Sequence, residues 1–395
     1  MELYILDNLL RRETVVDRYE SLIWTERFRD IGDFDLSIDS SRKTRNMFNV
    51  GDRLALNESF RVMTVDNIDE SKDSEGRNML NITGKSIENT MDDRVATLPL
   101  VANGETPNWV LTGTPGDIAR QIFKEICIDG KLHPGDIIPF IDNGSSPRES
   151  GLLSYPKDTI LEPDTPISME VSPGSVLEII KQICDIYELG FRIARFADNG
   201  KLYFEIYAGS DRTTQQSTLP PVLFSPDLNN LSDISKLTSV ADFKNTAYVF
   251  SEKGSLMVYG DNVDPNVSGF ERRVLKVDAT DLGEATGTEL TNLLKQRGKE
   301  ALSEHRSITA FDGKIPENGS YRYGKHYQLG DLVEMRNEDG GTNNMRVAEQ
   351  IFASDAEGER SYPTLAFDLY ITPGSWRNWD YNQVWNTATK VWEEA

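Results

Sequence analysis

The hydrophobic pattern of this chain changes period along its length, and this change restricts the fold more than any other feature. In the first hundred residues, β-branched and aromatic residues recur between turn signals at 3–7, 15–27, 34–38, 60–66 and 78–82, as is typical of strands. Strand character returns after Pro221, at 243–251 and 255–260, and continues to Ile371. The pattern predicts a mainly β fold, with a β-barrel or sandwich at the N-terminal end.

The middle of the chain follows a helical period instead. Thr114 places a capping hydroxyl before Pro115 at the first helical position. One apolar stripe follows at i, i+4 and i+8, made of Ile118, Ile122 and Ile126. Residues 172–175 open a second helix in the same way, and we expect it to stop at Gly190.

Two further patterns complete the central and C-terminal parts. Strands are expected at 191–196 and 201–207, joined by a tight hairpin turn at Asn199-Gly200. These elements and the two helices predict an α/β module over 96–214. An amphipathic helix is expected at 288–306, with Gly298 as a tolerated weak point.

Two stretches at opposite ends of the chain have the same order of features. Residues 49–54 (NVGDRL) precede Arg61-Val62, an acidic stretch, a turn at 75–77 and a strand, and residues 328–333 (QLGDLV) precede Arg346-Val347 and the same series. A Gly-Asp turn before paired strands is common in β proteins, so two unrelated hairpins are the alternative. The shared order predicts a duplicated β-barrel, one copy at each end of the chain, flanking the α/β module.

Charge and composition exclude several classes of protein. The formal net charge is -22, and such a surface repels the phosphate backbone of nucleic acids. No apolar run is long enough to span a bilayer, and no basic segment opens the chain, so neither membrane insertion nor a secretory signal is expected. Cys127 and Cys184 end apolar helical runs, which suits buried reduced thiols, with a disulfide between them as the alternative.

The motifs that carry chemistry are weak. Residues 84–86 (GKS) look like the end of a phosphate-binding loop, but Met79 stands where its first glycine is required. The histidines, His133, His305 and His326, have no second ligand at zinc spacing. Neither an EF-hand loop nor a Gly-x-Ser-x-Gly elbow is present. We therefore predict no catalytic residues, no metal, no cofactor and no enzymatic activity.

Aromatic residues gather in the last 23 positions, 373–395. Tryptophan is favoured at partner interfaces because it buries a large area and keeps one polar group. The candidate interface residues are Trp376, Trp379, Tyr381, Trp385 and Trp392. The alternative is that these rings fold back onto the preceding barrel.

Several stretches in the same order resemble the tail-hub family, the minor tail proteins or baseplate hubs of siphophages and prophages of Gram-positive hosts, which is similar to the hub of contractile tails. They are 21–28 (SLIWTERF), 32–36 (GDFDL), 83–88 (TGKSIE), 207–213 (YAGSDRT), 224–226 (FSP), 245–249 (NTAYV) and 323–331 (YGKHYQLGD). Each motif alone is weak, and their collinear order carries the resemblance. It extends from about Leu3 to Leu369.

The resemblance implies a domain order. A first tube-like β-barrel would span 1–95, the α/β module 96–214 and a second tube-like barrel 215–372, with an inserted subdomain near 251–310 as an alternative. The Trp-rich segment 373–395 lies outside the resemblance. Three chains would make a ring of six barrels, which suits docking under a six-fold tube.

The resemblance also implies a structural role at the virion tail tip, after assembly in the host cytoplasm. The chain would form a homotrimer that joins the tail tube or distal tail ring to tip or fibre proteins. Its partners would be the distal tail or tail tube protein, the tape measure protein and tip or receptor-binding proteins. DNA would leave through its channel without sequence-specific binding.

Two other functions compete with the hub. One is a tail-associated peptidoglycan hydrolase, although the recognised hub leaves too few residues for a separate hydrolase domain. The other is a carbohydrate-binding or receptor-binding tail protein, which the aromatic residues near the end would suit.

Overall fold

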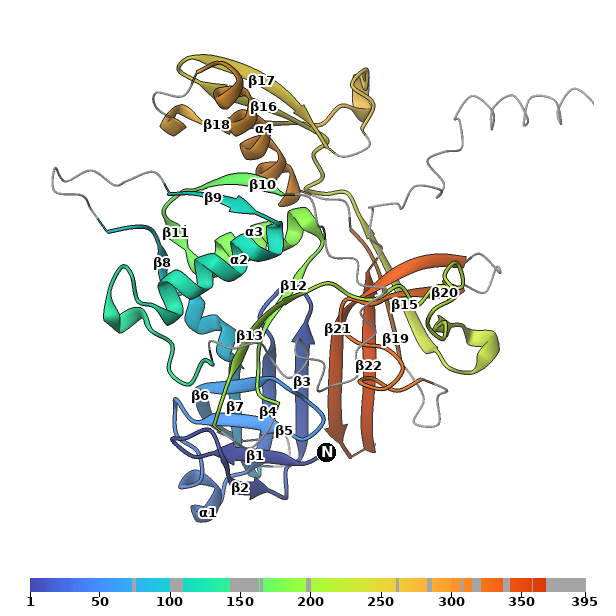
Figure 1. Ribbon diagram of the computed structural model, residues 1–395. Helices are drawn as coiled ribbons and strands as arrows, with labels where there is room; N and C mark the ends of the chain where they lie inside the picture. Colours follow the sequence, from blue (N-terminus) through green and yellow to red (C-terminus); the bar gives the residue numbers. More distant parts are fainter. Residues whose placement is uncertain are drawn as a thin grey trace, which may run out of the picture.

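The computed structural model describes most of the chain (Figure 1). The described residues are 1–72, 76–99, 109–142, 163, 166–196, 200–260, 263–282, 286–305, 308–314, 321–336, 342–356 and 358–366. At 232–238, 281, 308–314 and 342 the description covers the backbone only.

Strands from both ends of the chain build one sheet. The N-terminal strands are β1 (Leu3–Leu6), β2 (Arg12–Val16), β3 (Ser21–Arg27), β4 (Asp33–Asp39), β5 (Arg53–Leu56), β6 (Val62–Lys72) and β7 (Asn78–Ser86). The C-terminal strands are β14 (Leu223–Phe224), β15 (Ser232–Ser239), β19 (Ile308–Lys314), β20 (Leu332–Arg336), β21 (Thr342–Asp355) and β22 (Gly358–Ala366). Blue and red strands therefore lie side by side in Figure 1.

The order of the strands is β15-β19-β22-β21-β3-β4-β7-β6-β5-β1-β2, and β20 joins β21 to β14 beside this path. The prediction of a mainly β fold is confirmed. No closed barrel forms among the described residues, because β15 and β2 end the path with one partner each. The two predicted barrels are thus not confirmed, and the two halves share a continuous sheet.

At β3 and β4, alternation of side chains places the core on one face of the sheet, whereas β5 has buried residues on both faces. In β4, Phe34, Leu36 and Ile38 are buried, whereas Asp35 and Asp39 between and after them are exposed. Period-2 alternation of this kind is what a sheet with one covered face requires. Trp24 of β3 is fully buried in the same cluster as β4.

The central α/β part packs two helices against short strands. Its elements are β8 (Val95–Ala96), β9 (Trp109–Gly113), α2 (Pro115–Phe123), β10 (Ile167–Val171), β11 (Gly174–Ser175), α3 (Val176–Tyr187), β12 (Gly190–Ala194) and β13 (Tyr203–Tyr207). A π-helix, η2 (Lys124–Ile128), continues α2. Thr114 caps α2 as predicted, since its hydroxyl accepts the N–H of Asp117 at 3.2 Å.

Two details of this part differ from the expectation. The cap of α3 is Ser175, whose hydroxyl accepts the N–H of Glu178, and the helix ends at Glu188 in the left-handed region. Gly190 does not stop the helix but starts β12. The described β12–β13 pairing ends at Ala194↔Tyr203, and Asn199 of the predicted tight turn lies outside the described residues.

The remaining elements form a separate small layer at the top of Figure 1. They are β16 (Thr246–Ser251), β17 (Gly254–Tyr259), β18 (Val274–Asp278) and α4 (Gly287–Ser303). The sheet order is β17-β16-β18, and α4 covers it through a core that includes Val249, Val258 and Leu294. The helix predicted at 288–306 is confirmed. The predicted inserted subdomain near 251–310 contains most of this layer, and its boundaries, like those at 95, 214 and 372, stay predictions.

Short helical turns complete the described part. They are α1 (Arg42–Arg45), η1 (Ile87–Met91), η3 (Pro134–Asp136), η5 (Pro226–Leu228), η6 (Gly269–Glu271) and η7 (Thr280–Leu282). Cys127 and Cys184 are buried and not bonded to each other, as expected, and burial raises the pKa of the Cys127 thiol to about 12. No helix within the described ranges is long and apolar enough to cross a membrane.

Candidate assembly interface

The two Gly-Asp stretches form the same turn. In the first, the N–H of Asn49 donates to the Asp52 carboxylate at 2.8 Å, and Gly51 and Asp52 exchange backbone hydrogen bonds with Val65. Gly51 has φ +92, a conformation that residues with a Cβ rarely adopt.

The second turn repeats every one of these contacts. The N–H of Gln328 donates to the Asp331 carboxylate at 3.0 Å, and Gly330 and Asp331 exchange backbone hydrogen bonds with Val347. Gly330 has φ +88. Thr64-Val65 therefore corresponds to Arg346-Val347, and the predicted match of Arg61-Val62 with Arg346-Val347 is wrong.

A β-bulge follows each of these valines. In β6 the register with β7 shifts between Val65 and Asn67, and in β21 the register with β22 shifts between Val347 and Glu349. A bulge bends its strand and changes its pairing. Accordingly, β21 pairs with β20 before its bulge and with β3 after it.

The strand order extends this equivalence to a whole module. The series β3-β4-β7-β6-β5 corresponds to β15-β19-β22-β21-β20, with antiparallel pairing at every step. We call the first series the N-module and the second the C-module. The echo in the sequence therefore reflects a repeated sheet module and not two unrelated hairpins.

The two modules meet where β21 of the C-module pairs with β3 of the N-module, from Glu349↔Arg27 to Ser354↔Leu22. Arg27 bridges the junction, with Nε 2.7 Å from Glu349 and Nη1 2.5 Å from Asp33. Burial by itself would lower the pKa of Arg27, but the hydrogen bonds that Arg27 donates to Asp33 and Glu349 outweigh it and raise that pKa.

Phe28, the residue after β3, fixes the approach of three parts of the chain. Its N–H donates to the carbonyl of Ala348 at 2.8 Å, and its carbonyl accepts from Phe191 of β12 at 3.2 Å. A Cβ at Gly190 or at Gly330 would lie 2.2 or 2.4 Å from the Phe28 ring. The lack of a Cβ at both glycines therefore makes room for this ring. Their spacing in the sequence does not indicate this packing role.

A buried ion pair ties the N-module to the α/β part. Arg61 Nη1 lies 2.8 Å from Glu88 Oε1, with both side chains at most 1% exposed. The same Glu88 oxygen accepts the N–H of Ile193, and Arg61 also donates to the carbonyls of Arg27 and Phe191. Because an unpaired buried charge is costly, these contacts hold the parts in one arrangement.

A second buried cation joins the C-module to α3. Arg346 donates to the carbonyl of Gly330 at 2.7 Å and to Glu188 at 2.8 Å. Glu188 is the residue that ends α3 in the left-handed region. The turn of the C-module is therefore anchored to the helix end, and both modules have charged anchors into the central part.

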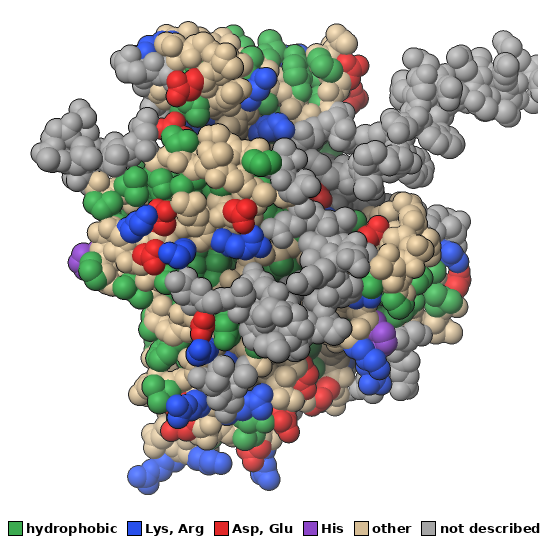
Figure 2. Space-filling model, viewed as in Figure 1, with side chains coloured by type: hydrophobic (Ala, Val, Ile, Leu, Met, Phe, Trp, Pro, Cys, Tyr) green, Lys and Arg blue, Asp and Glu red, His purple; other side chains and the backbone are tan. Residues whose placement is uncertain are grey.

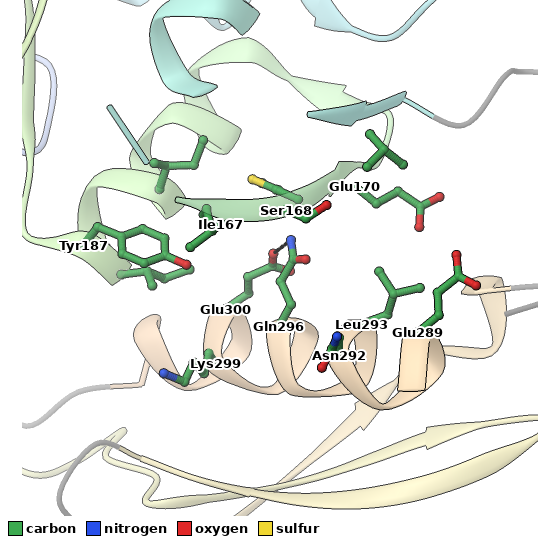
Figure 3. A pocket seen from close by; sticks show the side chains of 14 residues that line it. Ile167, Ser168, Glu170, Tyr187, Glu289, Asn292, Leu293, Gln296, Lys299 and Glu300 are labelled. Carbon is green, nitrogen blue, oxygen red and sulfur yellow. Dashed lines mark hydrogen bonds between the residues drawn. The ribbon is translucent and has the colours of Figure 1, made fainter. Parts of the chain in front are cut away.

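A cleft of about 610 Å³ separates α4 from β10 and α3 (Figure 3). Its walls combine Leu293 and Tyr187 with Glu170, Glu289 and Glu300, and Gln296 bonds Glu300 at 2.8 Å. Figure 3 shows side chains from α4 pointing toward β10. Ser168 and Lys299 also line the cleft, and neither a histidine nor a cysteine is among its described lining residues.

The other chemical expectations are tested only in part. No group of three or more metal-ligating side chains occurs within the described residues. The candidate interface residues Trp376, Trp379, Tyr381, Trp385 and Trp392 lie outside the described residues. Their role, and the hydrolase and carbohydrate-binding alternatives, stay predictions.

Comparison with known proteins agrees with this architecture. Residues 2–364 match the family described as Siphovirus ReqiPepy6 Gp37-like protein. A tail protein from Neisseria meningitidis MC58 has a TM-score of 0.53 at 14% identity, covering 93% of this chain and 96% of that chain. The 43 kDa tail protein of prophage MuSo2 from Shewanella oneidensis has a TM-score of 0.51 at 13% identity, with 93% and 96% covered. No curated protein sequence matches the chain. At these identities the likeness shows a shared fold.

Proposed function

Because this chain belongs to the Siphovirus ReqiPepy6 Gp37-like protein family, we propose that it is a structural protein of a phage tail that forms a trimeric hub at the tail tip. Its fold is shared with the tail protein from Neisseria meningitidis and the prophage MuSo2 tail protein, both of nearly the same length. The sequence motifs that resemble tail hubs lie within the matched region.

One observation carries the proposal: the chain contains the same sheet module twice, side by side in one sheet. Three chains would then supply six modules in a ring. A three-fold assembly of this kind can meet a six-fold tube with equivalent surfaces. The hub would join the tail tube or distal tail ring to tip or fibre proteins, and the tape measure protein would contact it from inside.

The sheet face that turns away from the core is suited to line the DNA channel. It carries Asp33, Asp35, Asp39, Asp69, Glu349 and Asp355 against Arg27, Arg53, Lys85 and Arg360. Acidic side chains repel the DNA backbone and allow it to pass without binding. On the face shown in Figure 2, acidic and basic side chains are mixed, and Lys and Arg gather at the lower end, near α1.

The purified chain tests this proposal. We expect light scattering after gel filtration to give the mass of a trimer, and electron micrographs to show a three-fold ring with a central hole. A monomer at all concentrations, in micrographs and in solution, would contradict the hub. A cell-wall zymogram run beside it separates the hydrolase alternative, because a clearing band would show lytic activity.

A further inference from the structure

In the N-module, one edge of β6 is exposed, whereas the equivalent edge of β21 in the C-module pairs with another strand. After its bulge, β21 pairs with β22 on one side and with β3 on the other. In β6, residues 67–72 pair with β7 on one side, and no strand pairs with the other side within the described residues. Exposed edges of this kind are normally covered, because they pair with other chains.

The strand that would cover this edge also exists in the chain. β15 corresponds to β3, since each pairs antiparallel with the next strand of its module, β19 or β4. The outer edge of β15 has no partner among the described strands. β15 and β6 lie far apart in the strand order of one chain, so a second copy must bring them together.

We propose that β15 of one copy pairs antiparallel with the 67–72 segment of β6 in the next copy, repeating between chains the β3–β21 junction within each chain. This inference rests on the proposed function, and names the strands that would close its ring. The register follows from the equivalences. Gly84 of the N-module is equivalent to Leu365 of the C-module, because each pairs with the valine before the bulge. Pairing across the next two strands makes Phe34 equivalent to residue 311, and Trp24 equivalent to residue 236. The transposed register therefore pairs Asn67 with Ser239, as Glu349 pairs with Arg27.

The exposed apolar residues of the two edges agree with this register. Val240 follows β15 as Phe28 follows β3, and it is 46% exposed, whereas Phe28 is 2% exposed. Gly51, the counterpart of Gly330, has nothing within 4 Å of an added Cβ.

A second exposed residue lies beside that glycine. Val50 is 66% exposed, whereas its counterpart Leu329 is 2% exposed and shares a cluster with Phe28. The transposed contact therefore places Val240 of one copy over Gly51 and Val50 of the next. It would bury two apolar side chains that a single chain leaves in water.

Engineered cysteine pairs test the register directly. Asn67→Cys with Ser239→Cys should give disulfide-linked dimers and trimers on a non-reducing gel after mild oxidation, because opposed residues lie within disulfide reach. The matched control is Arg27→Cys with Glu349→Cys, the equivalent pair inside one chain, which should close without any change in chain number. Cys127 and Cys184 can stay, because both are buried.

A disruptive variant gives an independent readout. Val240→Asp should raise the dissociation constant of the assembly at least tenfold in sedimentation experiments, whereas Val274→Asp, at a 44% exposed position of β18, should leave it unchanged. A trimer that forms without the 67–239 crosslink and tolerates Val240→Asp would refute this pairing and leave the hub intact. Absence of any trimer would count against the proposed function as well.

Discussion

At the level of single residues, the two modules differ in what surrounds their turn glycines. Gly51 and Gly330 have nearly the same φ, +92 and +88, but only Gly330 has a side chain, Phe28, packed where a Cβ would lie. The backbone requirement comes from the turn, and the packing requirement comes from the junction. The repeat thus provides an internal control for separating the two.

Replacement of each glycine by alanine should show this difference. Gly51→Ala should cost about 1–2 kcal/mol of unfolding free energy from the left-handed backbone. Gly330→Ala carries the same strain plus overpacking against Phe28, which adds about 1–3 kcal/mol. Urea unfolding measures both, in a Val240→Asp background that removes the proposed contact between copies. Equal losses of unfolding free energy for the two variants would show that the Phe28 ring moves aside at little cost.

Part of this residue-level detail can be read from the sequence. The Gly-Asp pairs stand out because a turn needs glycine and a carboxylate within four positions. The valine that each turn bonds was misassigned in the N-module, because the segments between turn and strand differ in length. The close approach of Gly190 to the Phe28 ring is not predictable from the sequence, because these residues belong to distant elements. The sequence pattern around Gly190 instead predicts a helix stop.

At the level of elements, helix starts were predictable because caps are local. Thr114 and the following proline are adjacent in the sequence and in the structure. The partners of strands were not predictable in the same way. The β3–β21 junction connects Arg27 with Glu349, residues 322 positions apart, and two separate barrels fit the same strand pattern as one shared sheet.

The interior of α4 contains a glycine whose packing role differs from the prediction made from the sequence. Gly298 was expected to be a tolerated weak point, but a Cβ there would lie 2.6 Å from Val258 Cγ2 and 3.0 Å from Val249 Cγ2. The glycine therefore allows α4 to lie close against β17 and β16. Its cost in helix propensity, about 1 kcal/mol relative to alanine, is offset by this packing.

Gly298→Ala should consequently destabilise the small layer despite its better helix propensity. We expect faster hydrogen exchange in 246–259 and 287–303, with little change in the large sheet. Asn292→Ala at an exposed position of the same helix is the control, and it should slow exchange slightly. A stabilising effect of Gly298→Ala would mean that the helix can move away from the sheet without loss.

At the level of the whole molecule, a ring would gather part of the net charge of -22 of each chain around one channel. The acidic sheet face would point into a channel in which the charges of three chains add together. Such a lumen would keep DNA away from the wall, over a distance of roughly 8 Å at physiological salt. The alternative, in which acidity serves only solubility, predicts no special effect of this face.

Reversal of charge on the sheet face decides between these readings. In the assembled trimer, Asp35→Lys with Asp39→Lys would direct the lysines of all three chains into one channel, so we expect a short DNA duplex to bind at low salt. Fluorescence anisotropy measures this binding, which should weaken steeply as salt rises because released counterions drive it. Asp264→Lys with Glu271→Lys changes the net charge equally at exposed positions of the small layer and should bind DNA far more weakly. Equal binding by the two variants, or none by the first, would place the acidic sheet face outside the channel even if the trimer is correct.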